Sequence, residues 1–517
     1  MKVISAQTMQ ELDSRAIRER GIPGLELMEH AGHACMEAIF HEFGYTGGKR
    51  AVIFAGRGNN GGDGYVIARL LLQSGWQVRV FILAERDRIV GDAAINLEQL
   101  PPAVVSYHTV AGGLAGLHEE ELRQADVIVD ALLGTGLNSE VSGIQREAVE
   151  LINASGRPVL AVDIPSGIHG TTGRAMGCAV RADVTVTFAC AKLGHVLYPG
   201  ADCTGRLVVA DIGIPADLVA EANGCEFLTA DSVRPLVRRR DRQAHKGRFG
   251  HCLIVAGSAG KTGAAALAAN SAVRTGSGLV TLAVAESINP ILEIKTTEAM
   301  TVPLPEAGNG HLAMSALGAI EQVIPGKNVL AVGPGLGQHP ATVALVQTLV
   351  KSTVLPLVLD ADGLNALARD AGILRNKKST AMVLTPHPGE MARLLGVSVA
   401  NVEADRIGTA GAFACTFGVH VVLKGARTII ATPDGSLAVN GSGNPGMASG
   451  GMGDVLTGII CSLLGQGYSA RDACCLGVFI HGFAADLVAE AKGEIGMNAG
   501  DVQEMLPHAF TRLLAEP

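Results

Sequence analysis

The sequence has few aromatic residues, few charged residues and no basic surplus. Phe, Trp and Tyr make up 3% of its 517 residues, charged residues 17%, and the net charge is −8. One short basic cluster, at residues 238–242, is interrupted by an aspartate. An acidic chain of this kind does not offer the positive surface that nucleic-acid binding requires, so no nucleic-acid partner is expected.

Long apolar runs and paired cysteines are also missing. Glycine or a charged residue interrupts the apolar stretches before they reach the roughly 18 residues of a membrane span, so no membrane partner is expected. The ten cysteines form no CxxC pair and no zinc-like spacing with histidine. Scattered thiols behind an N-terminus without an apolar signal segment favour a reducing compartment, and we expect a cytoplasmic protein.

Glycine and aliphatic residues are abundant, and they are arranged in two series of short β-rich runs alternating with helical segments. The chain contains 66 glycines, and 48% of its residues are hydrophobic. Its length exceeds one ordinary domain. Periodicity is weak between the two series. We therefore predict an α/β protein with a doubly wound N-terminal domain at residues 1–218, a linker at 219–244 and a C-terminal domain at 245–517.

In the first series, polar residues follow the predicted strands. Strands are predicted at residues 50–55, 127–130 and 158–163, and a helix at 5–20 begins near Ser5. A glycine loop at 56–64 is predicted to precede a helix at 65–74. Parallel strands present their carboxyl ends at one edge of the sheet, where ligands bind. The residues expected to converge there are Asn59, Asn60, Asp63, Asp130 and Asp163.

Two chemistries suit this edge. Asn60, Asp130 and Ser166 offer oxygen ligands from three segments, which favours a hard cation over zinc. Asp163 and Lys192 could form an acid–base pair, with the ammonium steadying the carboxylate. The alternatives are that Asp63 caps a helix, that Asp163 caps the turn after its strand, and that Lys192 is an ordinary surface lysine.

The second series is dominated by the stretch NGSGNPGMASGGMGDVLTG at residues 440–458. A glycine-rich loop that opens a helix presents free N–H groups to an anion. Asp454 would stand beside the bound phosphoryl group and take the proton of a substrate hydroxyl. Residues 424–428 would hold the phosphates or sugar of a nucleotide. The alternative is a flexible loop followed by a helix-capping aspartate.

Other polar residues of this series are less specific. The segment GSAGKTG at residues 257–263 lacks the first glycine of a Walker A motif, because Val255 stands there, so a Walker NTPase is excluded. Asp360 and Asp362 could touch Mg²⁺ or cap the following helix, and the cap is the favoured interpretation. Glu390 and His387 also follow a strand, and His387 could be purely structural.

Taken together, the motifs resemble a known family. GRGNNGGDG, DALLGTG, VDIPSG and TFACAKLG, at residues 56–64, 130–136, 162–167 and 187–194, resemble the NAD(P)H-hydrate epimerase domain. A second set of segments resembles the ribokinase-like NAD(P)H-hydrate dehydratase domain. These segments lie at residues 245–263, 333–337, 359–367, 384–396, 421–430 and 444–458. In this order they cover nearly the whole chain, which resembles the bifunctional NAD(P)H-hydrate repair enzymes.

The resemblance implies two activities. The epimerase, with bound K⁺, would interconvert the R and S hydrates of NADH and NADPH (NADHX and NADPHX). The dehydratase, with Mg²⁺, would phosphorylate the ring hydroxyl of the S form from ADP, and loss of phosphate would restore NAD(P)H and leave AMP. A homo-oligomer is also expected. The residues alone do not decide whether ADP or ATP is the phosphoryl donor. They also do not decide whether NADHX or NADPHX is the preferred substrate.

The resemblance also assigns residues. Asp163, Lys192 and Asp454 would be catalytic, and K⁺ would be held by Asn60, Asp130 and Ser166. The epimerase substrate would contact Asn59, Asn60, Gly61, Gly62, Asp63, Gly134, Thr135, Gly136, Leu137, Asn138, Ser139, Glu140 and Asp163. The dehydratase substrate would contact Ala264, Gly335, His387 and Asp454, and the nucleotide Lys424, Gly425, Ala426, Arg427, Thr428 and Gly453. One departure is His30, where the family usually has Asn.

Two alternatives remain at this stage. The GMGD motif also permits a small-molecule kinase of ribokinase-like fold fused to a nucleotide-binding domain, which would release a stable phosphorylated product. The first domain could instead only bind a partner, in which case it would not convert the R hydrate into the S hydrate.

Overall fold

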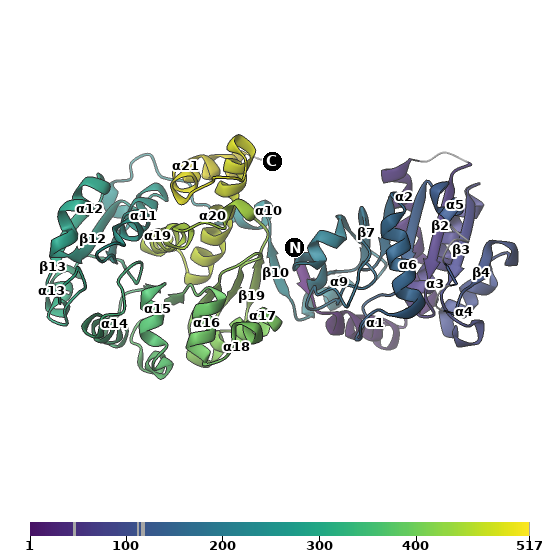
Figure 1. Cartoon of the computed structure of the whole chain (residues 1–517), viewed down its shortest axis with the longest axis horizontal. Helices are drawn as coiled ribbons and strands as arrows, with labels where there is room; N and C mark the ends of the chain where they lie inside the picture. The colour runs from purple at the N-terminus through teal and green to yellow at the C-terminus, as the bar shows by residue number, and fades with distance from the viewer. Residues whose placement is uncertain (45–47, 111–112, 115–118, 516–517) are drawn as a thin grey trace. The chain divides into compact units, whose positions relative to one another are not determined.

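The computed structural model describes residues 1–44, 48–110, 113–114 and 119–515. The chain divides into two compact units (Figure 1), the first comprising Lys2–Cys225 and the second Glu226–Pro517 together with Met1. Both units are α/β, as the sequence predicts. The stretch expected as a linker, residues 219–244, includes strand β10 (Cys225–Leu228) and helix α10 (Ala230–Val233).

The first unit is built on a parallel sheet with strand order β4-β3-β2-β5-β6-β7-β9. The order runs outward in both directions from β2, so the switch point of the sheet lies between β2 and β5. The strands are β2 (Arg50–Ala55), β3 (Gln77–Ile82), β4 (Val105–Tyr107), β5 (Val127–Ala131), β6 (Val159–Val162), β7 (Val184–Phe188) and β9 (Arg206–Ala210). A separate parallel pair joins β1 (Lys2–Ile4) to β8 (Ala191–Lys192).

Helices cover both faces of this sheet, which explains why its strands are continuous apolar runs. One core cluster contains side chains of α1 to α4 and the other contains side chains of α5 and α6. The helices are α1 (Ala6–Arg20), α2 (Gly24–Phe43), α3 (Asn59–Gln73), α4 (Gly91–Glu98), α5 (Glu119–Arg123), α6 (Gly143–Ala154), α7 (Leu193–Val196), α8 (Gly200–Thr204) and α9 (Ala216–Glu221).

The prediction of a glycine loop at residues 56–64 is wrong about where the loop ends, because α3 already begins at Asn59. Its glycines serve close packing. A methyl group built at Gly61 would lie 2.0 Å from the carbonyl oxygen of Gly56, and one at Gly64 would lie 2.7 Å from Cβ of Ala131. Only glycine therefore lets the first turns of α3 rest on the ends of β2 and β5, so helix propensity is sacrificed for packing.

The second unit has the strand order β13-β12-β11-β14-β15-β16-β17-β18-β19-β10. The strands from β13 to β17 are parallel, and β18 runs antiparallel to both of its neighbours. They are β11 (His251–Val255), β12 (Leu279–Ala285), β13 (Met300–Leu304), β14 (Val329–Val332), β15 (Leu357–Leu359), β16 (Met382–Leu384), β17 (His420–Leu423), β18 (Ile429–Ala431) and β19 (Leu437–Asn440).

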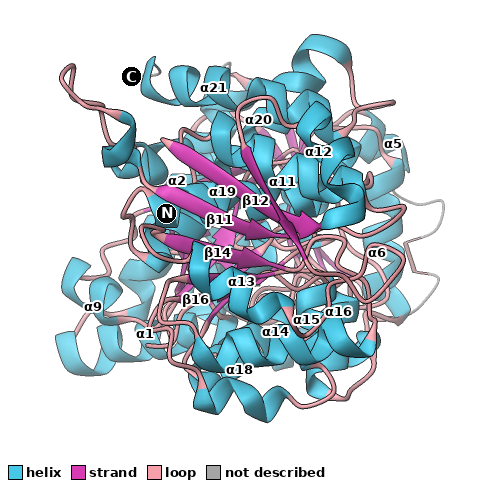
Figure 2. Ribbon diagram, turned by 90° about the vertical axis from the view of Figure 1, so that its left-hand side faces the viewer, coloured by secondary structure: helices cyan, strands magenta, loops and turns pink. Residues whose placement is uncertain are grey.

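Helices again form two layers, and Figure 2 shows β12, β11 and β14 side by side between them. One layer contains α11 (Thr262–Arg274), α19 (Met452–Gly465), α20 (Ala470–Lys492) and α21 (Ala499–Ala515). The remaining helices are α12 (Asn289–Lys295), α13 (Ala316–Val323), α14 (Pro340–Ser352), α15 (Asp362–Leu367), α16 (Pro388–Leu395), α17 (Val399–Ala404) and α18 (Arg406–Phe417).

Helix α20 is the one described helix with the length and hydropathy of a membrane span. Of its most apolar window, 78% is buried inside the protein. Its side chains pack on α19, α21 and the sheet of the second unit. Burial in a protein core therefore accounts for its composition.

The packing of α19 on α11 yields a stability prediction. A methyl group built at Gly458 would lie 2.2 Å from the carbonyl oxygen of Ala268, whereas one at Gly263 would meet nothing within 4 Å. We expect Gly458→Ala to destabilise the second unit by about 1–3 kcal/mol. Gly263→Ala, also within a helix, should stabilise it by about 0.5–1 kcal/mol or leave it unchanged.

Calorimetry measures both variants. Fluorescence of Trp76, the only tryptophan, reports the first unit and should be unaffected. Equal melting shifts for the two variants would contradict this account of α19.

Candidate active sites

The carboxyl end of β5 places a buried carboxylate at the switch point of the first sheet. Asp130 is fully buried; its Oδ1 accepts a hydrogen bond from Ser166 Oγ at 2.6 Å and its Oδ2 one from Ser166 N at 2.8 Å. Burial raises the pKa of Asp130 to about 6, and the bonds from Ser166 limit the rise. No basic side chain pairs with Asp130 in the described ranges. The carboxylate therefore lacks a counter-charge.

Asn60 stands in the same region with its amide unused. Neither its Oδ1 nor its Nδ2 has a hydrogen-bond partner in the described part of the chain, although both are buried. A methyl group built at Gly134 would lie 3.4 Å from Asn60 Oδ1, so the glycine makes room for this side chain. An unpartnered buried amide is unfavourable unless a ligand satisfies it. Asn60 offers an unused amide oxygen and Asp130 an uncompensated carboxylate, and oxygen donors of this kind suit a hard cation such as K⁺.

A second group lies at the ends of β6 and β8. Lys192 is fully buried, and its Nζ donates to Asp163 Oδ1 at 2.6 Å, to Thr187 Oγ1 at 2.8 Å and to the carbonyl of Phe188 at 3.2 Å. Burial opposes ionisation of Asp163, but Lys192 outweighs it and keeps the pKa of Asp163 below its usual range. The predicted pairing of Asp163 with Lys192 is confirmed. The surface-lysine and turn-cap interpretations are wrong.

His195, which the sequence analysis did not single out, locks this pair in place. Its Nδ1 accepts the N–H of Lys192 at 2.9 Å, so the neutral ring carries its proton on Nε2, which donates to the carbonyl of Asp163 at 2.8 Å. Burial, reinforced by Lys192, lowers the pKa of His195 to about 4. His195 is therefore a fixed neutral bridge between the two charged residues.

Two further carboxyl groups surround Lys192. Asp63 is the fifth residue of α3, so its interpretation as a helix cap is wrong. It is 8% exposed, and burial followed by repulsion from Asp163 raises its pKa well above the ordinary value. Asp13 of α1 also senses Lys192 and Asp163, and burial raises its pKa to about 6. Asp13 was not predicted as a site residue.

The predicted substrate loop at residues 134–140 begins beside Asn60 and ends in exposed residues. Gly134 lies against Asn60, and Thr135 lies near Gly170. Asn138, Ser139 and Glu140 are exposed at the far end of the loop. His30 lies elsewhere in this unit, where its Nδ1 is 2.8 Å from the carbonyl oxygen of Ile212.

In the second unit, Asp454 occupies the third position of α19. The helix begins after Gly451, which has φ of 93°, and no side chain caps it, so the helix-cap interpretation of Asp454 is wrong. Burial, followed by repulsion from Asp360, raises the pKa of Asp454 to about 7, although Lys424 lowers it. A carboxyl group with this pKa can accept and release a proton near neutral pH.

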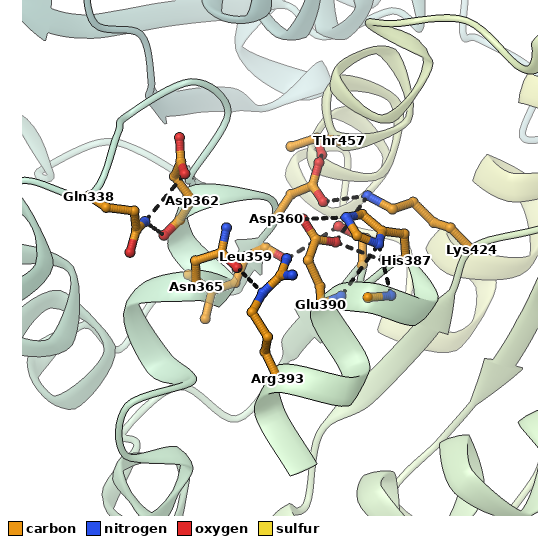
Figure 3. A network of polar contacts seen from close by, with 12 residues as sticks. Gln338, Leu359, Asp360, Asp362, Asn365, His387, Glu390, Arg393, Lys424 and Thr457 are labelled. Atoms are coloured by element: carbon orange, nitrogen blue, oxygen red, sulfur yellow. Dashed lines mark hydrogen bonds and ion pairs between the residues drawn. The ribbon is translucent and has the colours of Figure 1, made fainter. Parts of the chain in front are cut away.

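Lys424 is the cation of this site (Figure 3). Its Nζ donates to Asp360 Oδ1 at 2.7 Å and lies 3.8 Å from Glu390 Oε2. A methyl group built at Gly453 would lie 3.2 Å from the same Nζ, so the ammonium adjoins the first turn of α19. Asp360 Oδ2 accepts a hydrogen bond from Thr457 Oγ1 of α19 at 2.8 Å. Asp360 thereby links Lys424 to the helix, and its favoured interpretation as a helix cap is wrong.

Asp362 connects two glycine-rich turns. Its Oδ2 accepts bonds from Lys261 Nζ at 3.0 Å and from the N–H of Gly337 at 2.8 Å, while Gln338 approaches its Oδ1 (Figure 3). The N-cap position of α15 is occupied by Ala361, and no side chain caps this helix. The interpretation of Asp362 as a helix cap is therefore also wrong.

The predicted substrate residues Gly335 and Ala264 adjoin each other in these turns. A methyl group built at Gly335 would lie 3.2 Å from Cβ of Ala264.

His387 has a defined structural role that leaves part of its ring accessible. Its Nδ1 accepts the N–H of Gly389 at 3.0 Å at the start of α16, and Glu390 Oε2 accepts the N–H of His387 at 2.8 Å. Its side chain is 50% exposed. Burial, followed by Lys424, lowers the pKa of His387. The ring is therefore held neutral beside Lys424.

The turn at residues 424–428 packs against the start of the glycine-rich loop. Arg427 adopts φ of 57°, and its Nη1 donates to the carbonyl of Gly441 at 2.6 Å. Thr428 Oγ1 donates to the carbonyl of Gly425 at 3.0 Å, and Arg406 donates to the carbonyl of Ala426. The turn predicted to bind nucleotide is thus fixed next to the helix that carries Asp454.

These two sites define the class of protein: a two-domain α/β enzyme with one acid–base site in each domain. A family model described as NAD(P)H-hydrate dehydratase matches residues 252–508, and one described as YjeF-related protein N-terminus matches residues 24–194. The bifunctional NAD(P)H-hydrate repair enzyme Nnr of Moorella thermoacetica is 45% identical, over 100% of this chain and 98% of its own length. The bifunctional NAD(P)H-hydrate repair enzyme Nnr of Thermofilum pendens is 42% identical, over 99% of this chain and 97% of its own length.

The chain belongs to the family of bifunctional NAD(P)H-hydrate repair enzymes. A ribokinase-like superfamily protein from Enterococcus faecalis has a TM-score of 0.50 and 23% identity, and it covers 56% of this chain and 97% of its own. This likeness supports the ribokinase-like fold. The family membership decides against a small-molecule kinase and against a first domain that only binds.

The raised pKa of Asp454 makes a prediction about stability. Between its ordinary pKa of 3.8 and its folded value of about 7, the folded state holds a proton that the unfolded state has lost. The free energy of unfolding of the second unit therefore falls as pH rises from about 4 to about 7. Asp454→Asn removes this penalty, so its stabilising effect should grow from at most about 1.7 kcal/mol at pH 5 to at most about 4 kcal/mol at pH 8.

Calorimetry of the second unit against pH measures this effect. The control is Asp434→Asn, because hydrogen bonds from Thr432 and Ser436 lower the pKa of Asp434 to about 2. That variant should bring no gain at pH 8. A stability gain from Asp454→Asn that is the same at pH 5 and pH 8 would disprove the raised pKa.

Proposed function

We propose that the first unit interconverts the R and S hydrates of NADH and NADPH, and that the second dehydrates the S hydrate using ADP. The observation that carries the proposal is Asp454, a carboxyl group with a pKa of about 7 at the start of a glycine-rich helix and beside Lys424. The names of the relatives, bifunctional NAD(P)H-hydrate repair enzymes, support the substrate.

In the second unit, Asp454 takes the proton of the ring hydroxyl as that oxygen attacks the terminal phosphoryl group of ADP. The N–H groups at the start of α19 and the ammonium of Lys424 stabilise the charge on the transferring group. AMP leaves, and elimination of phosphate from the ring restores NAD(P)H. The turn at residues 424–428 holds the AMP part, while Ala264, Gly335 and His387 contact the hydrate.

Mg²⁺ would neutralise charge on the ADP phosphates. Both oxygens of Asp360 accept hydrogen bonds, from Lys424 and Thr457, and both oxygens of Asp362 are engaged as well. Each carboxylate oxygen has two acceptor sites, so Asp360 Oδ1 and Oδ2 and Asp362 Oδ1 keep one that could hold the ion. Asp360 and Asp362 would then be the residues that hold a nucleotide-bound Mg²⁺.

K⁺ in the first unit would be held by Asn60, Asp130 and Ser166. The unpartnered amide of Asn60 and the uncompensated carboxylate of Asp130 both fit a cation. The ion would supply the counter-charge of Asp130 and order the chain around Lys192 and Asp163. The first residues of α3, Asn59–Asp63, and the loop from Gly134 would contact the hydrate.

The free cysteines fit a cytoplasmic enzyme, since none of the ten is paired. We also propose a homo-oligomer, which light scattering of the purified chain tests directly.

Asp454→Asn should separate the two activities. The variant lacks the base, so dehydration of the S hydrate with ADP should fall at least about 100-fold, while R and S still interconvert. Absorbance of the restored NADH measures the first activity and chromatography of the hydrates measures the second. Parallel assays with ATP establish the phosphoryl donor. Full dehydration by the variant, or a stable phosphorylated product from the wild type, would contradict the proposal.

Potassium should stabilise the first unit. A ligand that binds only the folded state raises the unfolding temperature with its concentration. We expect the Trp76 fluorescence transition to shift upward with KCl and less with LiCl at the same ionic strength. Asp130→Asn should abolish the difference between the two salts. A K⁺-specific shift that persists in Asp130→Asn would rule out this site.

A further inference from the structure

Arg406 is the first residue of α18, and its guanidinium lies behind the turn that is predicted to bind nucleotide. Its Nη1 donates to the carbonyl of Ala426 at 2.7 Å. Its Nη2 donates at 3.3 Å to the carbonyl of Leu423 and at 3.3 Å to that of Lys424. One side chain from a distant helix therefore binds three of the four carbonyls in the run 423–426.

The N–H groups on the opposite side of this turn are unused. A trans peptide unit points its C=O and N–H in opposite directions, so the N–H of Gly425 points away from the guanidinium that binds the carbonyl of Lys424. The carbonyl of Gly425 accepts the hydroxyl of Thr428 at 3.0 Å, which likewise turns the N–H of Ala426 the other way. Neither N–H has a hydrogen-bond partner in the described part of the chain, and both residues are exposed. Both donors are therefore available to a ligand.

The backbone of the turn has the alternating handedness of an anion-binding site. Gly425 has φ of 146° and Arg427 has φ of 57°, whereas Ala426 between them has no positive φ. Such alternation makes successive N–H groups converge on one point, where they hold an anion such as a phosphate oxygen. A methyl group built at Gly425 would lie 2.7 Å from Arg406 Nη2. Glycine is thus required both for the turn and for the approach of the guanidinium.

The charge of Arg406 is poorly neutralised. Its side chain is 16% exposed, and its one ion-pair partner within the described ranges is Glu403, with Oε2 at 3.9 Å from Nε. The Nε itself is buried and has no hydrogen-bond partner there. A buried cation held chiefly by carbonyl oxygens weakens folding unless its charge serves another purpose. Here the positive charge lies directly behind the free N–H groups and adds to their attraction for an anion.

Rigid elements deliver this guanidinium to the turn. Asp405 Oδ1 accepts the N–H of Gly408 at 2.8 Å, which caps α18 and fixes the residue that follows the cap. Helix α18 packs on β17 and β18, the two strands that the turn connects. The position of Arg406 is therefore set by the same strands that set the position of the turn.

We propose that Arg406 is a positioning residue of the nucleotide site, a role that rests on the proposed function of the second unit. Its guanidinium holds the carbonyls of residues 423–426 so that the opposite N–H groups bind the phosphate group next to the adenosine of ADP. Arg406 acts from behind the turn, by fixing its shape and by supplying positive potential. It therefore governs the affinity for nucleotide and not the affinity for the hydrate.

Three variants of the full-length chain test this role. Arg406→Met keeps the aliphatic stem and removes the guanidinium. Arg406→Lys keeps the charge but has a single nitrogen, which cannot replace the two that span the carbonyls. The matched control is Lys377→Met, because Lys377 Nζ also donates to a backbone carbonyl, that of Phe417, at 2.6 Å at the other end of α18.

We expect Arg406→Met to raise KM for ADP at least about 10-fold in the dehydration of S hydrate, while KM for the hydrate changes less than about twofold. Arg406→Lys should raise KM for ADP by an intermediate factor, and Lys377→Met should leave both KM values unchanged. AMP should inhibit the wild type far more strongly than adenosine does, and Arg406→Met should reduce this difference. Conversion of R to S hydrate without ADP should be the same in all variants.

Equal rises in KM for ADP and for the hydrate would overturn the role of Arg406, as would an unchanged KM for ADP. Inhibition of the wild type by adenosine as strong as that by AMP would also overturn it, because the turn would then recognise no phosphate. If Arg406→Met does not fold, the comparison of Arg406→Lys with Lys377→Met decides. Failure of the wild-type chain to dehydrate S hydrate with ADP would instead contradict the proposed function of the second unit.

Discussion

A lysine ammonium paired with a carboxylate organises each of the two sites, and it is fully buried in the first unit and partly buried in the second. Lys192 bonds to Asp163 in the first unit, and Lys424 bonds to Asp360 in the second. A buried cation is tolerated only with a partner and further hydrogen bonds, so each lysine fixes the strand ends and the helix around it. In both sites the carboxyl groups outnumber the nearby cations. The excess carboxyl groups have raised pKa values and become suitable for proton transfer.

Glycine makes both arrangements sterically possible. The first turns of α3 rest on β2 and β5 because Gly61 and Gly64 have no side chain. Gly453 leaves room for the ammonium of Lys424, and Gly458 lets α19 lie directly on α11. The glycine-rich motifs therefore bring helix N-termini close to the buried charges, in addition to presenting N–H groups.

The sequence was sufficient for much of the fold and for the principal charged groups. Strand ends rich in Asp, Asn and Gly predicted polar groups at the carboxyl ends of the parallel strands, and the structure has Asp130 and Asp163 there, bonded to Ser166 and Lys192. The start of α3 was mispredicted, since glycine signals a loop locally but here permits tertiary packing. The helix-cap interpretations of Asp360 and Asp362 failed because their partners, Thr457 and Gly337, are distant in sequence.

Asp13 and His195 were missed for different reasons. Asp13 lies on the buried stripe of a helix that was predicted, so a carboxylate at a core position was the available signal. His195 gave no such signal, because its role depends on a backbone bond to Asp163, which lies on another strand end. A residue such as Asp13 is found from the sequence only when its charge and its expected burial are considered together.

The central claim is that each site raises the pKa of its surplus carboxyl groups above that of an ordinary aspartate. ¹³C NMR titration of the chain with labelled aspartate carboxyls, assigned through single Asp→Asn variants, measures this most directly. The account predicts that Asp454 titrates near pH 7, that the pKa of Asp63 lies well above that of an ordinary aspartate and that the pKa of Asp163 lies below it. Titration of Asp454 and Asp63 near pH 4, together with the exposed aspartates, would contradict it.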